Sequence, residues 1–143
     1  MDGLNAWVGY SQIDAAAETS DGNRTQTAIG ATYAVGSVTV GYQETRDNLA
    51  SRDTGTSFYD NQAYGISFSV NDDLSLSYGE HKSDKALVNG GATVENKTAS
   101  LQMAYTMGGA TLKIAETSSD NITYSTTAYN DRNATTVALS LAF

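Results

Sequence analysis

The feature that most constrains this chain is an alternation of apolar and polar residues with a period of two. The C-terminal segment shows it most clearly, because one face would carry Thr135, Val137, Leu139, Leu141 and Phe143. Successive side chains of a β-strand point to opposite faces of the sheet, so this pattern predicts a strand with one apolar face. Apolar residues do not recur at helical spacing over any useful length.

The same alternation recurs along the chain and predicts eight strands. They cover roughly residues 4–13, 25–35, 38–45, 61–71, 74–82, 97–107, 110–117 and 132–143. Short turns at Gly36-Ser37, Asn71-Asp72-Asp73 and Gly108-Gly109 alternate with long polar connections, near residues 14–24, 45–60, 82–97 and 117–131. This order predicts an all-β, antiparallel, up-and-down sheet. Every short turn and both chain ends should lie at one end of the strands, and the long connections at the other.

Composition narrows the chemistry. The sequence of 143 residues contains no Cys and one His, which excludes disulfides, thiolate metal sites and a His cluster. The formal net charge of −8 argues against nucleic-acid binding, which needs a basic face. We expect no cofactor and no bound metal.

Aromatic residues occur at two levels along the expected strands. One level lies near the short turns and comprises Tyr33, Phe68, Tyr105 and Phe143. The other lies nearer the long connections and comprises Tyr10, Tyr42, Tyr64 and Tyr78. Two aromatic levels separated by aliphatic residues are typical of the two interfaces of a membrane, so we expect a transmembrane β-barrel. Ordinary cross-strand aromatic packing is the alternative.

The polar face of the expected strands is rich in Gly, Ser, Thr, Ala and Gln, with Lys113 as its main charge. Such small side chains would leave voids inside a closed eight-stranded barrel, whereas they suit the wall of a wider, water-filled one. The candidate pore-lining residues are Gln43, Ser67, Ser77, Gln102, Lys113, Thr136 and Ser140.

Three segments resemble the general porins of Gram-negative bacteria, especially the alphaproteobacterial type. They are residues 133–143, the hairpin at residues 107–112, and residues 64–69. The resemblance implies the C-terminal half of a 16-stranded barrel in the outer membrane, assembled as a homotrimer. It also implies contact with outer-membrane lipids and lipopolysaccharide, and passive diffusion of small hydrophilic solutes and ions.

In that family, a C-terminal aromatic residue on an alternating strand is the signal that the barrel-insertion machinery reads. The resemblance therefore assigns this role to Val137, Leu139, Leu141 and Phe143. The family's pore-constricting loop belongs to the other half of the barrel, so no constriction residue is transferred to this chain. A complete small eight-stranded barrel that acts as a structural anchor or adhesin is the alternative function.

We do not expect an enzyme. Glu80-His81 with Asp84 could suggest acid–base catalysis, but no nucleophile is tied to them by spacing, and a solvated loop His is the better interpretation. Asn71-Asp72-Asp73 could contribute to a Ca²⁺ site, yet its spacing fits a tight turn better than an EF-hand loop.

The charges are concentrated in the long connections of this strand assignment. Carboxylates around a channel mouth attract cations and repel anions within about a Debye length, ~10 Å at 0.1 M salt. The sequence therefore predicts a weak cation preference, opposed locally by Lys113.

Overall fold

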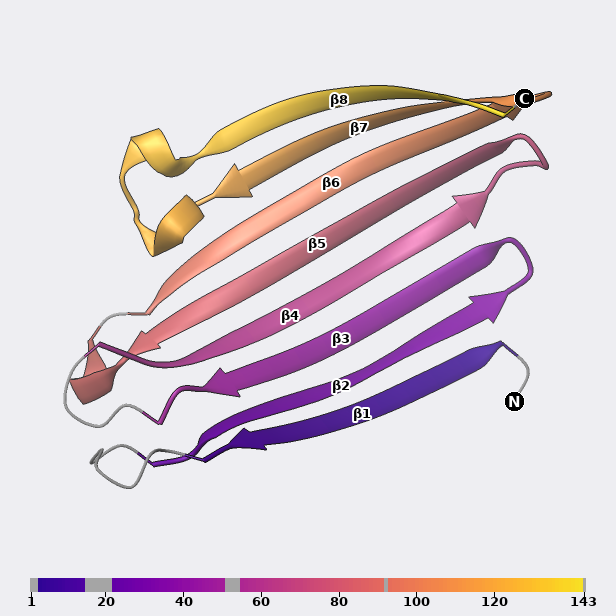
Figure 1. The fold of residues 1–143 in the computed structure, drawn as a ribbon. Helices are drawn as coiled ribbons and strands as arrows, with labels where there is room; N and C mark the ends of the chain where they lie inside the picture. The colour runs from indigo at the N-terminus through magenta and orange to yellow at the C-terminus, as the bar shows by residue number, and fades with distance from the viewer. Residues whose placement is uncertain (1–2, 15–21, 51–54, 92, 143) are drawn as a thin grey trace.

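The computed structural model describes residues 3–14, 22–50, 55–91 and 93–142, which form one eight-stranded sheet (Figure 1). The strands are β1 (Leu4–Ile13), β2 (Arg24–Val35), β3 (Val38–Asn48), β4 (Thr56–Ser69), β5 (Leu74–Leu87), β6 (Val94–Met107), β7 (Ala110–Asp120) and β8 (Arg132–Leu141). Three short 3₁₀ turns lie in the long connections: η1 (Val88–Gly90), η2 (Ile122–Tyr124) and η3 (Ala128–Asn130). No helix in these ranges is long and apolar enough to span a membrane.

The predicted all-β, antiparallel, up-and-down sheet is confirmed, since each strand pairs with the next one along the chain. The short turns gather at one end of the sheet, on the right in Figure 1, together with the start of β1 and the end of β8, and the long connections gather at the other end. The sheet is open. In the described part of the chain, β1 pairs only with β2 and β8 only with β7, so these two strands form the edges.

Local chemistry explains the three short turns. Gly36 and Gly108 follow β2 and β6 directly and adopt φ angles of 57° and 59°, in the left-handed region that favours glycine. In the β4–β5 turn, the side-chain Oδ1 of Asn71 accepts hydrogen bonds from the backbone N–H groups of Asp73 and Leu74 at 2.9 and 2.8 Å. This Asx-type turn confirms that the segment serves as a tight turn.

At the end with the long connections, the strands are longer than the sequence indicated. β4 begins at Thr56 rather than near residue 61, and β5 continues to Leu87 rather than ending near residue 82. The extensions carry charges on neighbouring strands: Arg46 faces Asp60 at 3.5 Å, whereas Lys82 faces Lys97. The prediction that charges concentrate in the loops is therefore wrong, because many of them lie within the strands.

The sheet has two unlike faces, because residues opposite each other across an antiparallel ladder point the same way. We call the face with Ser77 of β5 the polar face and the face with Leu76 the apolar face. No hydrophobic core joins them: in the described ranges, Ala86 is the one apolar residue that is buried. The fold is a single layer with two chemically different faces.

Candidate functional site

The polar face carries all seven candidate pore-lining residues: Gln43, Ser67, Ser77, Gln102, Lys113, Thr136 and Ser140. Ser67, Ser77 and Gln102 are directly opposed on β4, β5 and β6, and the same row continues through Ala115 to Thr136. The pattern of two thus brings together residues up to 69 positions apart in the sequence.

Small residues on the polar face project little from the sheet. Gly41, Gly65 and Gly79 lie side by side in one cross-strand row on β3, β4 and β5. A nearby hollow of ≈ 230 Å³ is lined in part by Gln102 and Lys113. Hydroxyl, amide and ammonium groups at such a surface can exchange hydrogen bonds with water or with a hydrophilic solute.

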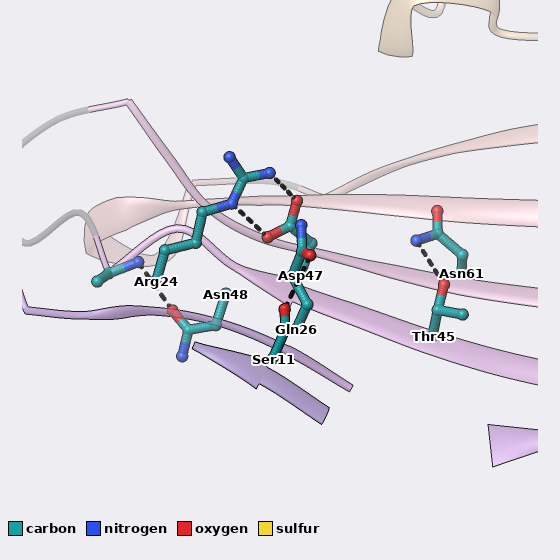
Figure 2. Close-up of polar contacts among 8 residues, drawn as sticks. Ser11, Arg24, Gln26, Thr45, Asp47, Asn48 and Asn61 are labelled. Atoms are coloured by element: carbon teal, nitrogen blue, oxygen red, sulfur yellow. Dashed lines mark hydrogen bonds and ion pairs between the residues drawn. The ribbon is translucent and has the colours of Figure 1, made fainter. Parts of the chain in front are cut away.

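Near the long connections, hydrogen bonds link polar-face side chains of neighbouring strands (Figure 2). The Ser11 hydroxyl donates to the side-chain oxygen of Gln26 at 3.2 Å. Arg24 forms a bidentate pair with Asp47, in which Nε donates to Oδ1 at 2.8 Å. These contacts join β1, β2 and β3 and hold the polar side chains in fixed positions.

The connection between β7 and β8 folds back over this polar face. The Tyr124 hydroxyl of η2 lies 2.7 Å from the Ser83 hydroxyl on β5, and its ring centroid lies 5.5 Å from that of Tyr59 on β4. Asn121 and Thr123 have φ angles of 53° and 66°, a costly region for residues other than glycine. The segment therefore covers part of the polar face in a strained conformation that these contacts maintain. Sequence reasoning missed this placement.

Exposed large apolar side chains lie on the apolar face of β1 to β6 and of β8. Its large side chains include Val137 and Leu139, each 65% exposed, and Leu101, 60% exposed. Val137, Leu139 and Leu141, which the porin resemblance assigns to the insertion signal, all lie here, opposite Ile114, Leu112 and Ala110 of β7. Phe143 lies outside the described residues. A soluble monomer rarely leaves an apolar surface of this extent in contact with water.

Tyrosines mark the border of the apolar face nearest the long connections. On β1, β3 and β5, a Tyr hydroxyl donates to a side-chain oxygen two residues further toward those connections. The three pairs are Tyr10 to Gln12 at 2.9 Å, Tyr42 to Glu44 at 3.1 Å, and Tyr78 to Glu80 at 2.9 Å. Each hydroxyl therefore points toward the end of its strand that carries the long connection.

Beyond this border, Glu80 anchors a cluster of charges. Its side chain is 6% exposed, and its Oε1 lies 3.3 Å from Lys97 Nζ and 3.8 Å from Lys82 Nζ. Lys82 also lies 3.8 Å from Glu95. These residues come from β5 and β6 and neutralise a carboxylate that would otherwise be buried without a counter-charge.

The aromatic level near the short turns crosses the strands obliquely. Ile66 shares a cross-strand row with Tyr33, and Phe68 lies two residues nearer the turns. Met103 shares a row with Phe68, and Tyr105 again lies two residues nearer the turns. A shift of ~6.7 Å along the strand over two strand spacings of ~9.6 Å corresponds to an angle of about 35°.

The residues considered for acid–base chemistry do not come together in one site. Glu80 lies on the apolar face and His81 on the polar face, because they are neighbours on one strand. No group of three His, Cys, Asp or Glu residues that could hold a metal ion occurs in the described ranges.

Trp7 is a further polar-face residue that the sequence analysis did not single out. It lies directly opposite Gly30, and a Cβ added to Gly30 would come within 2.3 Å of the indole ring. The absence of a side chain at Gly30 thus leaves space for the Trp7 ring of the neighbouring strand. The position of Trp7, out of phase with Leu4 and Val8, is the sequence signal that places it on this face.

Comparison of the chain with protein-family models, curated proteins and solved structures found no match. Its function must therefore be inferred from the two faces themselves.

Proposed function

We propose that this chain forms part of the wall of an outer-membrane β-barrel channel, through which small hydrophilic solutes and ions diffuse passively. The observation that carries the proposal is the exposed apolar face, which includes Val8 at 82% and Leu139 at 65% exposure, on a sheet without a core. Lipid removes the cost of exposing such a surface to water.

Two features of the apolar face support a membrane setting. The aromatic level crosses the strands at about 35°, which agrees with the strand tilt of ~35–45° in transmembrane barrels. The Tyr hydroxyls on β1, β3 and β5 point from the apolar band toward polar groups, as expected for rings at a membrane–water interface.

The polar face supports a channel rather than a filled barrel. Its rows of glycines and hydroxyl-bearing residues leave room for water between the larger side chains of the same face. Following the resemblance to general porins, we propose a barrel wider than these eight strands, in a homotrimer that contacts lipid and lipopolysaccharide. Its assembly would depend on the barrel-insertion machinery, and no catalytic residue is involved.

Refolding followed by planar-bilayer recording tests the proposal. The protein is diluted from urea into buffer, into detergent and into lipid vesicles, and β-structure is measured by circular dichroism. We expect stable β-structure only with detergent or lipid, and stepwise conductance after insertion into a planar bilayer. A folded, monodisperse protein in plain buffer would contradict the membrane assignment. Membrane insertion without conductance would instead favour the anchor or adhesin.

A further inference from the structure

The strands sort their charges between the two faces. The polar face carries four cations and one carboxylate, a net charge of +3: Arg24, Lys85, Lys113, Arg132 and Asp47. The strand residues of the apolar face carry three cations and seven carboxylates, a net charge of −4: Arg46, Lys82, Lys97, Glu44, Asp60, Glu80, Asp84, Glu95, Glu116 and Asp120. The polar face is thus opposite in sign to the chain as a whole, whose formal charge is −8.

The cations of the apolar face are paired with carboxylates of the same face. All three cations there lie near carboxylates: Arg46 at 3.5 Å from Asp60, Lys97 at 3.3 Å from Glu80, and Lys82 at 3.8 Å from the same carboxylate. The remaining negative charge of that face is separated from the polar face by the thickness of the sheet.

On the polar face, Arg24 is neutralised by its bidentate pair with Asp47. Lys85, Lys113 and Arg132 have no carboxylate within 4 Å in the described ranges. Lys85 instead lies over the Tyr124 ring, at 5.8 Å from its centroid, which leaves its charge uncancelled. Three cationic groups therefore face whatever passes along this surface.

We propose that the channel selects small anions, such as chloride, phosphate and carboxylate-bearing solutes, because its wall on this chain is cationic. The inference rests on the proposed channel function and names its preferred solute class. Lys85 and Arg132 lie near the long connections, whereas Lys113 lies close to the short turns, so cations occur near both ends of the path. An ion about 10 Å from one unit charge in water gains about 0.4 kcal/mol, which is about a twofold change in its local concentration.

This inference reverses the cation preference expected from the sequence. That expectation placed the carboxylates in loops around the mouth. Of the 16 acidic residues, the register places seven on the strands of the apolar face, where they do not line the channel, and Asp47 on the polar face; the other eight lie outside the described strands. Net charge alone does not give the charge of the polar face, because period-two alternation divides the strand charges between the two faces.

Reversal potentials of the protein in planar bilayers, under a tenfold KCl gradient, test the proposal. We expect the wild-type channel to favour chloride over potassium. Lys85→Gln and Lys113→Gln should each lower the chloride-to-potassium permeability ratio by about two- to fourfold, and the double change to Glu should invert the preference. The matched control is Lys82→Gln, which removes the same charge three residues away on β5 but on the other face, and should leave the ratio unchanged.

The possible results separate the two proposals. Cation preference of the wild-type channel at low salt would overturn the anion inference, as would equal shifts for Lys82→Gln and Lys85→Gln. Absence of any conductance in the wild-type protein would overturn the proposed channel itself. Conductance with anion preference that responds only to the polar-face substitutions would support both.

Discussion

A single arginine placed on either face of β8 distinguishes a membrane wall from a soluble sheet. Leu139 lies on the apolar face, opposite Leu112, and Ser140 lies on the polar face, opposite Thr111. Leu139 is 65% exposed, so its replacement removes little packing within the sheet. In water, Leu139→Arg and Ser140→Arg should therefore both change the free energy of unfolding by less than about 0.5 kcal/mol.

In lipid, the two substitutions should differ strongly. Arginine near the midplane of a bilayer costs about 2–4 kcal/mol on the lipid face of a barrel, and little on the lumen face. Leu139→Arg should therefore lower the folding equilibrium constant by roughly 30- to 1000-fold, since ~1.4 kcal/mol is a factor of ten, with Ser140→Arg near wild type. Urea titration in lipid vesicles, followed by fluorescence of the single tryptophan Trp7, measures both values. Equal costs for the two variants would refute the assignment of the apolar face to lipid.

Three further predictions concern stability and permeation. Gly30→Ala should destabilise the protein by about 1–3 kcal/mol, because the new methyl group meets the Trp7 ring; Gly79→Ala, whose Cβ would lie 3.8 Å from its nearest neighbour, should cost less in the same urea titration. Lys97→Met should cost about 1–3 kcal/mol by leaving a buried carboxylate poorly paired, and an unchanged urea midpoint would contradict that role. Tyr124→Ala removes a hydrogen bond to β5 and a ring contact with β4, and should raise single-channel conductance; unchanged conductance would place η2 outside the permeation path.

Alternation predicted the sheet and its faces well, because it reports directly which side chains point the same way. Ser67, Ser77 and Gln102 come from three strands, yet the structure places them in one row. The short turns were equally clear, since Gly36 and the Asn71 side chain provide local chemistry that a turn requires.

The ends of the strands were harder to predict from the sequence. Charged residues at Arg46, Asp60 and Lys82 resemble loop residues when each strand is considered alone. Arg46 and Lys82 each lie near an opposite charge on the neighbouring strand, an arrangement that depends on register and not on local sequence. Tyr124 was missed for the same reason, because its partner Ser83 is 41 residues away and the connecting segment has no periodic pattern.

The two edges of the sheet place a further requirement on the proposed channel. β1 and β8 each leave one row of backbone N–H and C=O groups unpaired within the described sheet, which is costly in hydrocarbon. Because strand direction alternates, β1 and β8 run antiparallel to each other, so closure needs either direct pairing of these edges or an even number of further strands between them. Direct pairing would enclose a lumen in which the row of Gly41, Gly65 and Gly79 contributes no side chains, whereas the interior of an eight-stranded barrel is normally filled by them. For the proposed water-filled channel we therefore propose the wider closure, with an even number of additional strands between β8 and β1.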